Sequence, residues 1–342
     1  MALGILVVLI IFGNYLPIDL GKNSLIIWSI VLLIYCFIAS VTPVQILLQP
    51  RDYLSSFLLF AGMTFGYIGL IISRPQVHFP VYLVWKGTEG MLWPILFVTI
   101  ACGAVSGFHS LIASGTTSKQ LPNERYARRI GYGGMVTEGL VAVLALLAVV
   151  CGLSNQEALS SFLTKGGPGP VAAFGKGYGQ ITASFLGSFG AIFAITMLNS
   201  FILTTLDTAT RIGRYLTTEL FKINNRYFST LIIVFLGGWL ALSGKWNKIW
   251  PAFGAANQLI AALTLIVVTC WLLSRKKTTG YTLIPSIFMA LTTVGALIFQ
   301  MSQYIRDNDW LLLTIAGILV CLAIFIFLET IMAVKKKWSK PN

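Results

Sequence analysis

The stretch ILFVTIACGAVSGFHSLIASGTTSK, residues 95–119, decides the fold class. Its apolar part lies in a segment over residues 91–114 that contains no Asp, Glu, Lys or Arg. A helix needs about 20 predominantly apolar residues to cross the hydrocarbon core of a bilayer. The segment therefore predicts a transmembrane helix, and its serines, glycines and histidine are polar groups placed inside that helix.

The composition of the whole chain extends this conclusion. Only 35 of the 342 side chains are charged, which is 10%, against roughly 25% in an ordinary soluble domain. Hydrophobic residues make up 56% of the chain, and the mean hydropathy is +0.83. These values exclude a soluble globular enzyme, a disordered chain and a disulfide-stapled secreted domain. They predict an all-α polytopic membrane protein with a single integral membrane domain over residues 1–342.

Apolar segments of spanning length recur along the chain. A window of about 20 residues predicts a bundle of about ten transmembrane helices. Their expected bounds are Ala2–Ile18, Ser24–Leu48, Tyr53–Ser73, Met91–Ser114, Ile130–Leu153, Ile181–Leu206, Phe228–Leu242, Ala252–Leu273, Tyr281–Tyr304 and Trp310–Val334. The first segment has no basic residues before it and no clear cleavage site, so it is not interpreted as a signal peptide.

The basic residues give an independent prediction of orientation. Lys and Arg are enriched in cytoplasmic loops. With the C-terminal lysines placed inside, 16 of the 24 basic residues fall inside and eight outside, and every dense cluster is inside. We therefore expect a multi-pass protein of the inner (cytoplasmic) membrane with both termini cytoplasmic. The net charge of +13 then reflects topology, and no nucleic-acid partner is expected.

The fourth predicted span carries a polar face. At 100° per residue, small and hydroxyl side chains fall on one narrow stripe of the helix. The stripe comprises Gly103, Ser106, Gly107, Ser110 and Ser114, with His109 beside it. Close helix packing uses such small-residue faces and is one interpretation. The other, which also accounts for the histidine and for Gly115-Thr116-Thr117, is a cavity-lining and interrupted helix.

A second polar stripe runs along the sixth span and its exit. It comprises Thr196, Ser200, Thr204, Asp207 and Arg211, at helical spacing. Asp207 and Arg211 are four residues apart in the favourable order for an ion pair. One interpretation is a helix end held by that pair at the cytoplasmic interface, and the other is a proton relay or gate.

Two further places break the apolar pattern. Trp250-Pro251 opens the eighth span, and the amides of Asn257 and Gln258 follow. This pattern predicts a half-helix beginning here with unpaired N–H donors, which favour an anion, although simple helix initiation with an interhelical amide contact explains it equally well. Glu138, two turns into the fifth span, is a candidate buried titrating group.

The outside segment from Ser154 to Gln180 is rich in glycine and proline, which predicts a segment without regular helix. It is interpreted as a connector, with a re-entrant lid as the alternative. The five cysteines form no CxxC pair, which favours small packing groups over a zinc site or a disulfide framework. No P-loop or hydrolase motif occurs, so no cofactor is expected.

Five segments together resemble the carbon starvation protein A family. They are VTPVQILLQPRDYLSSF (41–57), TIACGAVSGFHSLIASGTTSKQL (99–121), IGYGGMVTE (130–138), LDTATRIGRYL (206–216) and FGAANQLIAAL (253–263). The resemblance implies a secondary transporter related to the amino acid–polyamine–organocation group. It also implies uptake of pyruvate with protons, or of peptides, during nutrient limitation. Usual members have a substantial membrane region upstream of the position of Met1, so the chain is expected to be N-terminally short, and a separate N-terminal membrane portion is a candidate partner.

The family's motif residues fall here at Pro50–Asp52, Ser106, His109, Ser114–Thr117, Glu138, Asp207, Thr208, Asn257 and Gln258. Together with the polar stripes, they give three sets of expected site residues. The substrate-binding set is Ser106, Ser110, Ser114, Thr116, Thr117, Asn257 and Gln258. The proton-coupling set is His109, Glu138 and Asp207. The gate or interface set is Arg51, Asp52 and Arg211.

We expect the segments 99–121, 196–216 and 250–263 to line a transport pathway. The expected function is proton-coupled uptake of a small carboxylate such as pyruvate. Peptide transport is the alternative within the same class, and a non-transporting membrane sensor or an inactive fragment is the alternative from a different class. The expected partners are the solute, the proton and the lipid bilayer.

Overall fold

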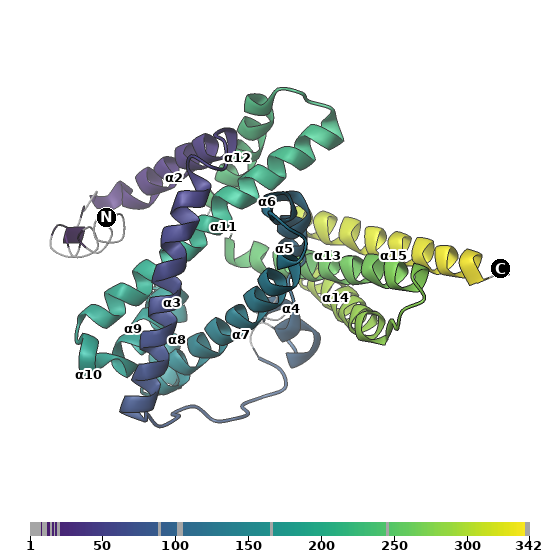
Figure 1. Ribbon diagram of the computed structural model, residues 1–342. Coiled ribbons are helices and arrows are strands. Elements are labelled where there is room, and N and C mark those ends of the chain that lie inside the picture. Colours follow the sequence, from purple (N-terminus) through teal and green to yellow (C-terminus); the bar gives the residue numbers. More distant parts are fainter. Residues whose placement is uncertain are drawn as a thin grey trace. The chain divides into compact units, whose positions relative to one another are not determined.

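The computed structural model describes residues 21–87, 90–100, 105–164, 167–243 and 246–338, together with residues 8, 12, 13, 16 and 18. The side chains of Lys22, Trp246–Lys248, Ile326 and Glu329–Trp338 are not described. Most of the predicted span Ala2–Ile18 therefore lies outside the described residues, as do Cys102 and Gly103. Figure 1 shows the helices along the chain.

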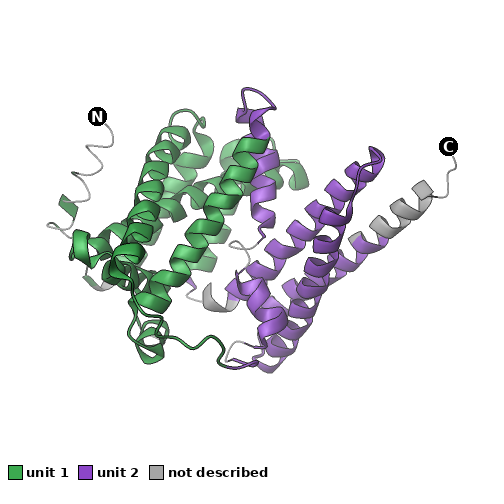
Figure 2. Ribbon diagram, turned by 60° about the horizontal axis from the view of Figure 1, so that its bottom comes forward, with its two compact units in different colours: residues 1–83, 128–242 green, residues 84–127, 243–342 purple. Residues whose placement is uncertain are grey.

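The chain forms two compact units, and each is built from two separate stretches of sequence (Figure 2). Unit 1 comprises residues 1–83 and 128–242, and unit 2 comprises residues 84–127 and 243–342. In the part of the chain that the structure describes, all regular elements of both units are helices.

The helices of unit 1 pack around one long central helix. Its helices are α2 (Ser24–Val41), α3 (Leu48–Ser73), α7 (Tyr126–Gly152), α8 (Gln156–Leu163), α9 (Pro170–Ile181), α10 (Ala183–Leu186), α11 (Phe189–Phe221) and α12 (Arg226–Leu242), with a short 3₁₀ turn over Gly21–Asn23. Helix α11 contacts α2, α3, α9 and α12. The apolar core lies between α3, α7, α9 and α11, where Tyr178 and Ala148 are fully buried.

Unit 2 is organised around α13. Its elements are a π-helical turn η2 (Leu92–Leu96), α4 (Phe97–Ile100), α5 (Gly107–Ile112), a π-helical turn η4 (Ala113–Thr117), α6 (Ser118–Gln120), α13 (Trp246–Ser274), α14 (Gly280–Arg306) and α15 (Trp310–Trp338). Helix α13 contacts α4, α5, α14 and α15. Buried alanines such as Ala255, Ala262 and Ala296 allow this close approach of helices.

Six of the described helices are long and apolar enough to cross a membrane. Their bounds are Ser24–Val41, Leu48–Ser73, Tyr126–Gly152, Phe189–Phe221, Ile249–Ser274 and Gly280–Arg306. In the most apolar window of α2, only 17% of the residues are buried. Such a helix would expose its apolar surface to water in a soluble protein, so the structure is that of a multi-pass membrane protein.

The prediction for residues 154–180 is wrong, because this segment contains α8 and most of α9. Its glycines and prolines begin and pack a helix instead of preventing one. Gly169 adopts φ +89°, and Pro170 occupies the first turn of α9, where its missing N–H costs no hydrogen bond. Gly177 then lies so close to α7 that a Cβ would meet the carbonyl of Ala148.

Candidate functional site

The predicted fourth span is an interrupted helix. Helix α4 is described as far as Ile100, and α5 begins at Gly107 after extended backbone at Ser106 (φ −115°, ψ 118°). The Ser106 hydroxyl caps the new helix by accepting the backbone N–H of His109 at 3.4 Å. Of the two interpretations of this span, the interruption is present. It lies at Ser106 and not at Gly115–Thr117, where the break was expected, because those residues belong to the π-helical turn η4.

Two neighbouring amides of α13 bind the two sides of this interruption. Asn257 Oδ1 accepts the backbone N–H of Phe108 at 2.7 Å and the hydroxyl of Ser106 at 3.3 Å. Gln258 Nε2 donates to the carbonyl of Phe97 in α4. Both amides are buried, with 2% and 4% of their surfaces exposed. Non-helical backbone within a membrane needs hydrogen-bond partners from protein or water. Here the side chains of α13 supply such partners on both sides of the interruption.

Close packing accompanies the interruption, which confirms the packing interpretation of the polar stripe, while its lining of a cavity stays a prediction. A Cβ at Gly107 would meet the backbone of Asn257 and Ala261, which means that only glycine fits between α5 and α13. One turn later, the hydroxyls of Ser110 and Thr264 lie 2.9 Å apart. Glycine and hydroxyl side chains on one face of α5 therefore fix its contact with α13.

The expected half-helix start at Trp250 is wrong. Helix α13 begins at Trp246, and Pro251 lies inside it. Membrane helices tolerate an internal proline where neighbouring groups satisfy the backbone, and α13 continues through Pro251. Gln300 Nε2 on α14 donates to the Pro251 carbonyl at 3.1 Å. Asn257 consequently lies within a continuous helix. It binds the interrupted span through its side chain and not through unpaired backbone N–H donors.

The remaining site residues of unit 2 extend from the interruption towards α6. His109 and Ser114 are exposed, while Thr116 and Thr117 are half-buried in η4. The hydroxyl of Ser114 donates to the Leu111 carbonyl at 3.2 Å. The structure thus brings Ser106, Ser110, Asn257 and Gln258 together, and it places Ser114, Thr116 and Thr117 one to three turns further along the chain.

A buried ion pair joins α3 and α11 in unit 1. The Asp207 side chain is fully buried, and its two carboxylate oxygens accept from Arg51 Nη1 at 2.5 Å and Nη2 at 3.2 Å. Tyr35 of α2 donates its hydroxyl to the same carboxylate at 2.9 Å. Arg51 also donates to the Leu203 carbonyl at 3.1 Å and to the half-exposed Asp52 at 2.6 Å. Three helices therefore meet at one buried carboxylate.

The predicted Asp207–Arg211 pair is wrong. Arg211 Nη2 instead donates to the carbonyls of Ala39 at 2.7 Å and Thr42 at 2.6 Å, at the end of α2. The last carbonyls of a helix have no partner within that helix, and a buried arginine with several N–H groups satisfies them. Arg211 is 4% exposed, so it anchors α2 on α11.

The other stripe residues have mainly local partners. Thr196 and Thr204 donate to carbonyls of α11 itself, whereas Ser200 lies 2.8 Å from Ser55 of α3. Glu138 is half-buried on α7. Tyr35 is the contact residue that sequence reasoning missed, because one tyrosine in a long apolar segment carries no spacing signal.

Comparisons with known proteins identify relatives. The profile of the family described as "Carbon starvation protein CstA" matches residues 1–160 and 152–296. The "Peptide transporter CstA" of Escherichia coli (strain K12) is 31% identical over 334 residues, covering 77% of this chain and 48% of that protein. The "Pyruvate/proton symporter BtsT" of the same organism is 30% identical over 355 residues, covering 77% and 49%.

A second organism carries a similar relative. The "Peptide transporter CstA" of Mycobacterium tuberculosis (strain ATCC 25618 / H37Rv) is 33% identical over 318 residues, covering 72% of this chain and 42% of that protein. The chain therefore spans about half the length of the curated relatives it matches. No solved structure matches this chain.

Proposed function

The chain belongs to the carbon starvation protein CstA family, and from that premise we propose that it takes part in proton-coupled uptake of a small carboxylate such as pyruvate. Relatives named as transporters of peptides and of pyruvate with protons support a transport function over an enzymatic one. The choice of pyruvate over peptide is part of the proposal.

The interruption at Ser106 is the observation that carries this proposal. Secondary transporters bind solutes where membrane helices are broken, because polar backbone and side chains become available there. Here the break is lined by the hydroxyls of Ser106 and Ser110 and bordered by Asn257 and Gln258. Uncharged polar groups of this kind suit a small carboxylate, since they add no permanent negative charge to the site.

The proton-coupling residues are part of the same proposal. His109 lies in the first turn of α5, next to the interruption, and histidine changes charge near neutral pH. Glu138 and Asp207 are the rival carriers. The buried pair of Arg51 and Asp207 is proposed as a gate, because it links the helix starting at Leu48 to the middle of α11. Segments 99–121, 196–216 and 250–263 are proposed to line the pathway.

The membrane arrangement is also proposed. We infer about ten spans in the cytoplasmic membrane with both termini inside, in a bundle related to the amino acid–polyamine–organocation transporters. The two-to-one excess of basic residues on one side supports the orientation. The broken helix supports a transporter core of this type.

Uptake into proteoliposomes tests the function. The full chain is reconstituted, and accumulation of labelled pyruvate is measured with and without an inwardly directed proton gradient. Accumulation that depends on the gradient is the expected result. Accumulation of a labelled dipeptide but not pyruvate would favour the peptide alternative, and accumulation of neither would favour a sensor or an inactive fragment.

A further inference from the structure

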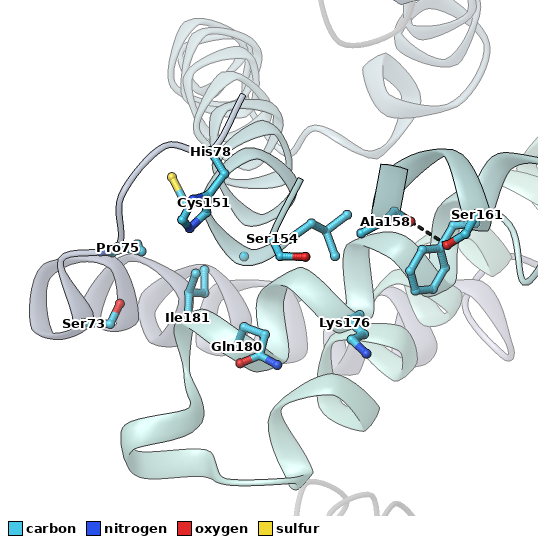
Figure 3. A pocket seen from close by; sticks show the side chains of 13 residues that line it. Ser73, Pro75, His78, Cys151, Ser154, Ala158, Ser161, Lys176, Gln180 and Ile181 are labelled. Carbon is cyan, nitrogen blue, oxygen red and sulfur yellow. Dashed lines mark hydrogen bonds between the residues drawn. The ribbon is translucent and has the colours of Figure 1, made fainter. Parts of the chain in front are cut away.

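Unit 1 contains a cavity that the sequence motifs do not mark. It has a volume of about 760 Å³ and lies between the ends of α3 and α7, helix α8 and one face of α9 (Figure 3). Cavities of several hundred Å³ accommodate small organic ligands. Arg51 lies at the start of α3 and Ser73 at its end, so the cavity is at the opposite end of this helix from the buried ion pair.

The polar lining of the cavity is basic. Lys176 and His78 line it together with uncharged groups that include Ser154 and Gln180, and none of its described lining residues is an aspartate or a glutamate. Glu157 of α8 neighbours the lining residue Ala158 in sequence but is not itself part of the lining. At neutral pH, Lys176 therefore gives the cavity a positive charge, which favours an anionic ligand.

The lining groups differ in whether they already donate hydrogen bonds within the protein. The hydroxyls of Ser73 and Ser161 donate to the carbonyls of Gly69 and Ala158, both at 2.7 Å, so their protons are already used (Figure 3 shows the second bond). In the part of the chain that the structure describes, Lys176 makes no ion pair. The side chains of Lys176 and Gln180 lie one helical turn apart on α9, and both line the cavity.

Lys176 lies on α9, which packs closely against its neighbouring helices. Gly175 lies against Ile195 of α11, and Gly177 lies against the backbone of α7. Neither position has space for a Cβ, so α9 is held directly between its neighbours. A site on a fixed helix positions its charge more precisely than a site on a loop.

We propose that this cavity is a carboxylate-binding site in which Lys176 pairs with the carboxylate and Gln180 and Ser154 donate hydrogen bonds. A charge-assisted pair of this kind is stronger than a hydrogen bond between neutral groups. The carboxylate belongs to a small acid such as pyruvate or to the C-terminus of a short peptide. The identification of this ligand as the transported solute rests on the proposed function, and the cavity then captures solute on the side opposite to Arg51.

Protection of Lys176 from acylation tests the site without requiring transport. The full chain in lipid nanodiscs is treated with an amine-reactive reagent, and modification of Lys176 is quantified by mass spectrometry. Pyruvate or dialanine should reduce this modification, whereas acetone and dialaninamide at the same concentrations should not. Protection by pyruvate alone identifies a small acid, and protection by dialanine alone identifies a peptide terminus.

Variants separate the charge of Lys176 from general effects on folding. Binding of labelled pyruvate and of labelled dialanine should weaken about tenfold or more in Lys176→Gln, as expected for loss of a charge-assisted contact. Lys176→Arg should retain binding. Lys222→Gln, at the C-terminal end of α11, removes the same charge elsewhere in unit 1 and should change nothing.

Two results would overturn the proposal. One is equal protection of Lys176 by carboxylates and by their neutral analogues, and the other is unchanged binding in Lys176→Gln. Failure of uptake with intact protection would instead reject the transport function and retain the binding site.

Discussion

Asn257 Oδ1 lies 2.7 Å from the backbone nitrogen of Phe108, so a side chain of α13 caps the first turn of α5. The same oxygen accepts the hydroxyl of Ser106 at 3.3 Å. Helix N-termini carry N–H groups without partners in the helix, and here one of them is satisfied by a residue 149 positions away in the sequence. The interruption is therefore part of the packing of unit 2.

Removing this acceptor should destabilise unit 2. Asn257→Leu leaves the Phe108 N–H and the Ser106 hydroxyl without their acceptor, at a cost of roughly 1–3 kcal/mol for a buried polar group. Thermal unfolding of the purified protein measures the loss. Asn257→Asp keeps an acceptor oxygen and should unfold closer to wild type; equal destabilisation by both variants would contradict the capping role.

The buried ion pair should depend strongly on both partners. Asp207→Ala leaves the Arg51 guanidinium, whose side chain is 17% exposed, without its principal partner, and breaking such a pair costs roughly 3–5 kcal/mol. A double-mutant cycle with Arg51→Met, followed by thermal unfolding, gives the coupling energy. Additive effects of the two substitutions would contradict direct coupling.

Asp207→Asn tests whether this carboxylate also carries the proton. The amide retains an oxygen for Tyr35 and Arg51 but cannot be deprotonated to carry charge. If Asp207 couples the proton, the variant should exchange labelled for unlabelled pyruvate across the membrane while losing gradient-driven accumulation. Normal accumulation would assign the proton to His109 or Glu138.

Some substitutions in the interrupted span should reduce transport while leaving membrane insertion intact. His109→Ala and Ser110→Ala are each expected to reduce uptake without preventing membrane insertion, because neither makes the span less apolar. Cys102→Ala, at a position outside the described residues, should be nearly silent. If His109→Ala transports normally between about pH 5 and 8, where histidine titrates, Glu138→Gln is the next variant to measure.

The glycines of α9 should be sensitive to a single methyl group. Gly177→Ala inserts a Cβ against the Ala148 carbonyl, and overpacking of this kind costs typically about 1–3 kcal/mol. Gly133→Ala on α7 is the matched control, because nothing lies within 4 Å of its added Cβ. The free energy of unfolding of this control should rise by roughly 0.5–1 kcal/mol, because alanine has a higher helix propensity than glycine. Thermal unfolding of both variants distinguishes packing from propensity.

Much of the helical framework could be predicted from local composition. The span expected over Tyr281–Tyr304 is α14 (Gly280–Arg306), and the span expected over Phe228–Leu242 is α12 (Arg226–Leu242). Apolar length and charge depletion are properties of each segment by itself. They determine that a helix forms in the membrane even before its neighbours are known.

The partners of the polar residues could not be predicted in the same way. Spacing along one helix suggested that Asp207 pairs with Arg211, but the folded chain brings Arg51 to Asp207 across 156 positions of sequence. Spacing shows which residues share a face, whereas the identity of the helix that covers this face depends on packing.

The sequence by itself determined that this is a helical membrane protein, where most of its helices lie and which face of the fourth predicted span carries its small and polar side chains. The tertiary structure decided that α13 caps the broken helix at Ser106, that Arg51 holds Asp207 and that glycines pack α9 against α7. The physical reason is that hydrophobicity acts through each segment's own composition, whereas a hydrogen bond, an ion pair or a close backbone contact needs two distant segments at one point in space.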